Sequence, residues 1–213
     1  MFTALENRVR FQRMDHLRFS GKSETEQRAA LEDIVRSEPV LMHVLEGLRE
    51  ADLADWILVA GAIYNSVWNR LTNRPSLTGI KDIDVFYFDD SDLGYEAENC
   101  VIEDINSRFS ALPLPVETRN QARVHLWFPE KFNQPFEPLT SSVEMLGRYA
   151  SKTHAVAVKL EQDDSMSIHA PFGLDDIFSF RVVPNHVLEN KVAHTEKGAR
   201  AKRTWPEISV EPW

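Results

Sequence analysis

The sequence predicts a mixed α/β fold, in the broad sense that includes α+β: a β-sheet of mixed strand direction with helices on its flanks. Segments of helical periodicity alternate with short strand-like segments along the 213 residues. Two strand-like segments, at 154–160 and 166–170, are joined by a tight polar turn, which is typical of an antiparallel hairpin. Hydrophobic residues make up 43% of the chain, enough for one substantial core.

Apolar residues at helical spacing predict two helices in the first quarter of the chain. The first covers 24–36, and the second begins near Pro39, which suits the first turn of a helix. We expect Ser37 to be the N-cap of the second helix. Both helices should pack on the sheet through their apolar faces.

The remaining chain alternates between the two periodicities. A continuous apolar run over 56–60 indicates a buried strand. In chain order we then expect a helix from Gly61, a strand over 80–88, a helix over 92–109, one long strand or two joined strands over 114–127, a helix over 142–150, the hairpin, and closing helices over 173–180 and 187–202.

The length of the chain fits one domain, which we place at 23–213 with the closing helices at its C-terminal end. Residues 1–22 carry five Lys or Arg against two Asp or Glu, so we expect a basic leader that is partly disordered. No apolar run is long enough to cross a membrane. Cys100 is the single cysteine, which excludes an intrachain disulfide and favours a reducing cytoplasm.

Two features of the charge distribution bear on possible partners. The net charge of −9 argues against an extended nucleic-acid partner, because phosphate backbones are bound by clustered cations. Residues 187–203 nevertheless carry five Lys or Arg against two Asp or Glu. This basic face could bind phosphates, but cations near a helix C-terminus are also favoured by the helix dipole.

Two carboxylates interrupt the apolar strand at 80–88. Asp82 and Asp84 are two residues apart, so both side chains leave the same face of a strand, with Cα atoms roughly 6.6 Å apart. Such a pair can hold Mg²⁺, which prefers oxygen ligands and usually shares them with substrate phosphates. The alternative is two ordinary acids at a solvent-exposed strand start, and an Asp-x-Asp pattern alone does not decide between them.

The segment before this strand adds an anion site. The buried strand at 56–60 runs through Gly61 directly into a helix, and a helix N-terminus presents free backbone N–H groups. A carboxylate pair that binds a metal, beside N–H groups that bind an anion, is what a nucleoside triphosphate requires.

A third polar row lies in the segment 116–126. If this segment is one strand, one face carries Glu117, Arg119, Gln121, Arg123 and His125. Glu117 could then supply a third carboxylate beside Asp82 and Asp84, and the two arginines could neutralise phosphate charge. The alternative is a solvent-facing strand with cross-strand ion pairs.

With these residues in view, the chain resembles a bacterial family of nucleotidyltransferase-like proteins within the DNA polymerase β-like superfamily. The resemblance runs from about Pro39 to Trp213 and rests on four stretches: ILVAGAIYNSVWNRL, GIKDIDVFYFDD, PVETRNQARVHLWFPEKF and APFGLDDIF. It implies the mixed-sheet nucleotidyltransferase fold. The superfamily motif of an apolar strand ending in Gly-Gly or Gly-Ser, an Asp-x-Asp strand and a later acidic residue is matched by Gly61-Ala62, Asp82, Asp84 and Glu117.

The sequence departs from the motif at one position that bears on phosphate binding. Ala62 lacks the hydroxyl of the usual Ser, so a phosphate contact there must come from backbone N–H groups, or from Asn65 or Ser66 in the next turn. A longer loop also separates Ala62 from Asp82 than is common in the superfamily.

The resemblance implies a Mg²⁺-dependent enzyme that transfers a nucleoside monophosphate from an NTP to a hydroxyl group, with release of pyrophosphate. Asp82 and Asp84 would hold the metal, and Glu117 would hold a second metal or act as base. The acidic chain favours a small-molecule or protein hydroxyl acceptor. Two alternatives stay open: a catalytically silent nucleotide-binding regulatory protein, and a metal-dependent phosphohydrolase that needs no acceptor.

Overall fold

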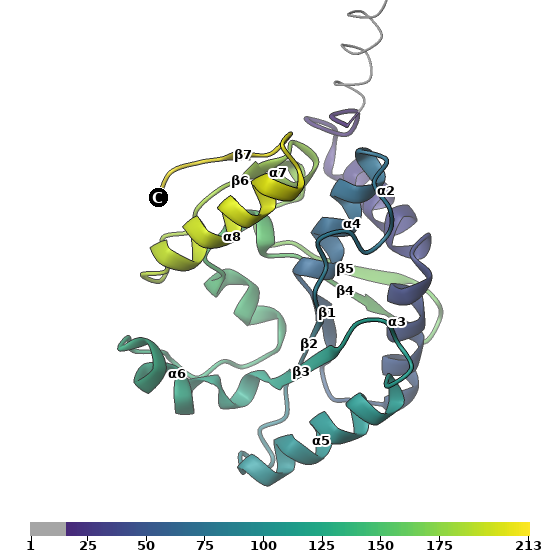
Figure 1. Ribbon diagram of the computed structural model, residues 1–213. Coiled ribbons are helices and arrows are strands. Elements are labelled where there is room, and N and C mark those ends of the chain that lie inside the picture. Colours follow the sequence, from purple (N-terminus) through teal and green to yellow (C-terminus); the bar gives the residue numbers. More distant parts are fainter. Residues whose placement is uncertain (1–15) are drawn as a thin grey trace, which may run out of the picture.

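The computed structural model describes residues 16–213, and the centre of the described part is a five-stranded mixed sheet (Figure 1). The strand order is β3-β2-β1-β4-β5. The strands are β1 (Ile57–Val59), β2 (Ile83–Tyr87), β3 (Val116–Asn120), β4 (Ala157–Leu160) and β5 (Met166–His169). Only β2 and β3 run parallel, and the other neighbouring pairs are antiparallel. The predicted mixed sheet and its hairpin are thereby confirmed.

Helices cover the sheet and extend beyond it. The α-helices are α2 (Glu24–Arg36), α3 (Pro39–Ala51), α4 (Gly61–Leu71), α5 (Tyr95–Arg108), α6 (Val124–Phe132), α7 (Asp175–Phe178) and α8 (Lys191–Thr204). The 3-10 helices are η1 (Gln121–Arg123), η2 (Val143–Arg148) and η3 (Lys152–His154). A small parallel sheet joins β6 (Arg181–Val182) to β7 (Ser209–Val210).

The start of α2 shows why its predicted bounds hold. The Ser23 side chain accepts from the backbone N–H of Glu26, and the Glu26 carboxylate accepts from the backbone N–H of Ser23, which forms a capping box. The prediction that Ser37 caps α3 is wrong. Its hydroxyl donates to the carbonyl of Ile34, so Ser37 closes α2, and Glu38 precedes Pro39 at the start of α3.

The packed structure begins before residue 23. Leu17 and Phe19 pack against the core, and the Phe19 ring meets Phe178 edge-on. The backbone N–H of Gly21 donates to the carboxylate of Asp175 at 2.7 Å. These residues of the expected leader thus contact the domain, while residues 1–15 of that leader lie outside the described residues.

The predicted long strand over 114–127 is wrong beyond Asn120. The Asn120 amide nitrogen donates to the carbonyl of Asp89, and its amide oxygen accepts from the N–H groups of Asp89 and Ala122. These bonds end the strand and turn the chain into η1 and α6. The predicted helix over 142–150 is also corrected, because η2 is a 3-10 helix over Val143–Arg148.

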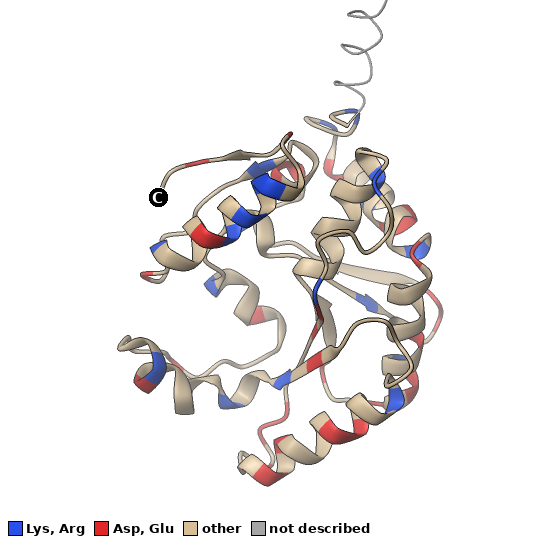
Figure 2. Ribbon diagram, in the orientation of Figure 1, with Lys and Arg blue, Asp and Glu red and all other residues tan. Residues whose placement is uncertain are grey.

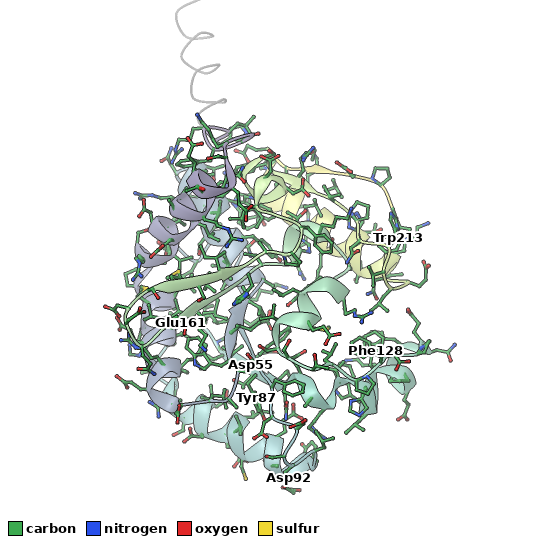
Figure 3. All side chains as sticks on the ribbon, turned by 180° about the vertical axis from the view of Figure 1, so that it is seen from behind. Asp55, Tyr87, Asp92, Phe128, Glu161 and Trp213 are labelled. Atoms are coloured by element: carbon green, nitrogen blue, oxygen red, sulfur yellow. The ribbon has the colours of Figure 1, made fainter. Side chains whose placement is uncertain are left out.

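The core is continuous across the sheet, and the C-terminal segment is built into it. Trp68 and Trp205 are both buried, with ring centroids 5.2 Å apart. The Trp205 indole N–H donates to the Asn69 side chain, which holds the end of α8 against α4. A separate small apolar cluster surrounds Phe128 on α6. Figure 3 shows Phe128 and the C-terminal Trp213 on the same side of the molecule, opposite Glu161 of the hairpin.

No helix among residues 16–213 is both long enough and apolar enough to span a membrane.

Replacing Gly79 with alanine is expected to lower the free energy of unfolding by about 1–3 kcal/mol. Gly79 has a φ of +74°, and a Cβ atom there would lie 2.5 Å from the ring of Trp205. Gly173→Ala is the matched control, because Gly173 has a φ of +75° but a Cβ atom there would have no neighbour within 4 Å. Denaturant titration should show the larger loss for Gly79→Ala, and equal losses would contradict a steric role for Trp205.

Candidate functional site

An open pocket of about 200 Å³ lies where the end of β1, the start of β2 and α8 meet. Four of its lining residues were predicted from the sequence: Gly61, Asn65, Asp82 and Asp84. The pocket therefore brings the expected carboxylate pair to the expected helix N-terminus. The lining also includes cations, aromatic rings and an imidazole: Lys81, Lys197 and Arg200, then Tyr64 and Tyr149, and finally His154.

Strand register explains why Asp84 occupies the middle of the site. On one side it is paired with Val59, the last residue of β1, directly before the turn into α4. On the other side it is paired with Glu117 of β3. Neighbouring strands are about 4.8 Å apart, so Asp84 lies close both to the N-terminus of α4 and to the third predicted carboxylate.

The electrostatic surroundings of Asp84 favour its protonated form. The pKa of Asp84 is raised to about 6, mainly by burial and next by the neighbouring Asp82 carboxylate. Glu117 raises this pKa further, whereas Lys197 and Arg119 oppose the shift. Two acids held together in a partly buried site gain from any cation that can neutralise them.

Glu117 is placed beside the pair but outside the pocket lining. Its side chain is exposed on β3, next to Asp84 across the strand pair. In the part of the chain that the structure describes, no group of three or more His, Cys, Asp or Glu side chains is arranged to hold a metal ion by itself. The arrangement is thus a pair of acids in the pocket with a third at its rim.

The turn before α4 presents backbone groups to the pocket. Ala60 has the positive φ of 54°, which is strained for a residue with a Cβ atom. Its carbonyl accepts from the N–H groups of Ile63 and Tyr64. Helix geometry leaves the N–H groups of Gly61 and Ala62 without intrahelical partners, and Gly61 also lines the pocket, so this is the end of α4 that an anion in the pocket would meet.

The side chains of this turn differ in what they can contribute. Ala62 is completely buried and its side chain has no polar group, so any contact from this residue to a ligand must come from its backbone. The Ser66 hydroxyl is buried and donates to the carbonyl of Ala62 at 2.7 Å, which commits it to the helix. Asn65 lines the pocket, and its amide nitrogen makes a long 3.5 Å bond to the carbonyl of Gly79.

The two predicted arginines lie outside the pocket lining. Arg119 is exposed on β3 and donates to the carbonyl of Thr118. Because the strand ends at Asn120, Arg123 does not share the face of Glu117. Arg123 instead pairs with Glu98 of α5 and donates to the carbonyl of Leu93, which gives it structural partners in place of a phosphate.

Of the cations that line the pocket, Lys197 and Arg200 come from α8, which the sequence motifs did not include in the site, and Lys81 lies directly before Asp82. Lys197 is half-buried, and burial lowers its pKa, while the nearby Asp84 carboxylate opposes that shift. Its ammonium lies 5.9 Å from the ring centroid of Tyr149. Figure 2 shows the basic positions along α8. The signal in the sequence was the basic face of 187–203, which the helix dipole explained equally well.

Comparisons with known proteins give a family match and a structural match. The model of a protein family described as Nucleotidyltransferase matches residues 46–210. A solved structure described by the words "The NMR structure of the protein reveals a CCA-adding enzyme head domain" is similar, with a TM-score of 0.70 and 26% sequence identity. That similarity covers 85% of this chain and 96% of that chain. No curated protein matches the sequence.

Proposed function

Because this chain belongs to the nucleotidyltransferase family, we propose that its pocket transfers a nucleoside monophosphate from a nucleoside triphosphate to a hydroxyl acceptor and releases pyrophosphate. One observation carries the proposal. The pocket sets Asp82 and Asp84 against Lys197 and Arg200, with the N-terminus of α4 beside them. A triphosphate with its metal needs this combination of carboxylates, cations and free N–H groups.

The donor set of the pocket fits Mg²⁺. Asp84 on β2 and Asp82 directly before it supply carboxylate oxygens, and Mg²⁺ commonly takes one or two carboxylates and completes its shell with phosphate and water. We assign Glu117, at the rim, to a second metal or to the role of base. Bound Mg²⁺ would stabilise the charge on the transferred phosphoryl group and on the leaving pyrophosphate.

The residues of the chain would share the remaining work. The N–H groups of Gly61 and Ala62, with Asn65, bind phosphate oxygens, while Lys197 and Arg200 neutralise the triphosphate. The acceptor oxygen forms a bond to the α-phosphorus, and the bond from that phosphorus to the bridging oxygen breaks. Pyrophosphate leaves with the electron pair, and the hydroxyl proton passes to a base.

The acceptor enters from the exposed side of β3, where Glu117 and Arg119 face solvent. We favour a small-molecule or protein hydroxyl, because the net charge of −9 disfavours extended nucleic acid. This differs from the similar solved structure, which is described as the head domain of a CCA-adding enzyme. We place the protein in the cytoplasm on the basis of its single cysteine.

A second candidate function is nucleotide binding without catalysis. Glu117 lies outside the pocket lining, and Ala62 offers no hydroxyl to a phosphate. A regulatory protein would need only the pocket and not the third acid. The two candidates differ in turnover, because both bind a triphosphate but only the enzyme releases pyrophosphate.

The test uses the complete protein with each of the four NTPs, with Mg²⁺ or with a chelator. We expect Mg²⁺-dependent binding in calorimetry, and pyrophosphate release with a labelled product once cell extract supplies an acceptor. Asp82→Asn should remove the Mg²⁺ dependence, whereas Asp90→Asn, an exposed acid after β2, should not. Binding without pyrophosphate would favour the regulatory protein, and nucleotide breakdown without any acceptor product would indicate a phosphohydrolase.

A further inference from the structure

A buried histidine lines the pocket without a role in the reaction described above. His154 is the last residue of η3, shortly before β4, and its side chain is only 2% exposed. Its ring stacks on Tyr64, with centroids 4.7 Å apart and an interplanar angle of 22°. Its Nδ1 atom is buried, and no described residue forms a hydrogen bond with it. The enclosed Nδ1 cannot meet a ligand, so any contact between the ring and a molecule in the pocket falls to the other ring nitrogen, Nε2.

Strand pairing places this ring beside the turn that begins α4. Ala157 of β4 is paired with Val59 of β1, and the N–H of Ala60 donates to the carbonyl of Val156 at 2.8 Å. His154 therefore lies just upstream of the strand that adjoins the Ala60 turn. Its stacking partner Tyr64 belongs to the first turn of α4. The imidazole is thus fixed next to the N–H groups that we assign to phosphate binding.

The burial of Nδ1 determines which ring nitrogen can serve the pocket. An N–H group buried without an acceptor is more costly than a lone pair in the same position, which favours the tautomer with hydrogen on Nε2. Because Nδ1 is enclosed, Nε2 is the nitrogen that can reach the pocket. The pKa of His154 is lowered to about 3, so the ring is neutral. Burial is the main cause, followed by the charges of Lys197, His194 and Arg200.

We propose that His154 is a triphosphate-binding residue, whose Nε2–H donates a hydrogen bond to a phosphate oxygen in the pocket. This inference rests on the proposed function of the same site. Lys197, Arg200 and the N-terminus of α4 all favour an anion in the part of the pocket that they line. A neutral donor adds a directed hydrogen bond there without adding positive charge, and stacking on Tyr64 keeps the donor in place.

The experiment compares His154→Phe, which keeps a stacking ring but has no donor, with His154→Gln, whose amide nitrogen reaches about as far as Nε2. Calorimetry measures the binding of ATP and of inorganic tripolyphosphate, both with Mg²⁺, to the complete protein. We expect His154→Phe to weaken both ligands about tenfold or more, since a hydrogen bond to a charged group is lost. His154→Gln should bind both far more tightly than His154→Phe does.

Thermal unfolding without ligand separates binding from a structural role. His154→Phe should unfold at the wild-type temperature or higher, because it removes the unpartnered Nδ1. Wild-type affinity for both ligands in a folded His154→Phe protein would overturn the inference, as would a loss confined to ATP. If His154→Phe fails to fold, His154→Asn takes its place, and equal affinity of the Asn and Gln variants would overturn it. Failure of the wild-type protein to bind either ligand would instead refute the proposed function.

Discussion

Asp84→Asn is expected to abolish nucleotidyl transfer, with a loss of about a thousandfold or more, and to stabilise the metal-free protein. The loss follows because an amide replaces the carboxylate at the centre of the site, between Val59 and Glu117 in the sheet register. The gain follows because the same carboxylate is half-buried beside Asp82 and is costly to ionise. Function and stability therefore make opposite demands on this residue.

The pH dependence follows from the sign of the shift. The pKa of Asp84 is raised from 3.8 to about 6 in the folded protein, by burial and then by Asp82. The folded state therefore holds its proton more tightly than the unfolded state, and stability falls as the pH rises from about 4 to about 6. Above that range the ionised group costs about 1–3 kcal/mol, after allowance for screening by water. Below it the cost is absent.

Denaturant titration with a chelator present should show this difference directly. Asp84→Asn should exceed the wild-type protein in stability at pH 7, and the difference should shrink toward pH 4. Asp90→Asn, which changes an exposed acid, should follow the wild-type curve. If the stability difference between the two proteins does not change between pH 4 and pH 7, ionisation of the Asp84 carboxylate is not what destabilises the wild-type protein.

Lys197→Met is expected to weaken triphosphate binding by about ten- to a hundredfold while leaving the fold intact. Methionine keeps most of the aliphatic length of lysine, so the packing of α8 over Tyr149 should survive. The variant loses the partly buried ammonium that lies in the field of Asp84 and Asp82. With that positive charge gone, the phosphate chain has only Arg200 to neutralise it from the part of α8 that lines the pocket.

Lys191→Met is the matched control, because Lys191 is exposed at the start of the same helix and does not line the pocket. Calorimetry at several salt concentrations should show a weaker salt dependence for Lys197→Met than for the control. Equal affinities of the two variants for Mg²⁺-triphosphate would remove Lys197 from the site.

Sequence patterns were sufficient to locate the centre of the candidate site. The alternation of Ile83 and Val85 with Asp84 and Phe86 defines a strand, and β2 confirms it over Ile83–Tyr87, with Asp84 on the strand and Asp82 directly before it. The passage from a buried strand through Gly61 into a helix is equally local, and α4 begins at Gly61. Both features depend on the period of side-chain direction within a few residues, which sequence patterns record well. The family and fold that these motifs suggested are confirmed by the family match and the similar structure.

The end of β3 shows where local patterns fail. The alternation from Val116 onward continues past Asn120 in the sequence, but the strand stops there. Its end is determined by hydrogen bonds between Asn120 and Asp89, which are 31 positions apart. As a consequence Arg123 pairs with Glu98 rather than sharing a face with Glu117. No periodicity within 116–126 contains that information.

Features that depend on residues close together in the sequence could therefore be predicted before the fold was known. These features are the acid pair, the helix N-terminus and the fold class. Cations and rings from distant parts of the chain complete the pocket, and their positions are determined by tertiary packing. Trp205 packs on Trp68, and this contact between distant segments brings Lys197 from the end of the chain to Asp84. The difference arises because side-chain direction is set locally by the backbone, whereas the position of α8 is set by the burial of apolar surface between segments far apart in sequence.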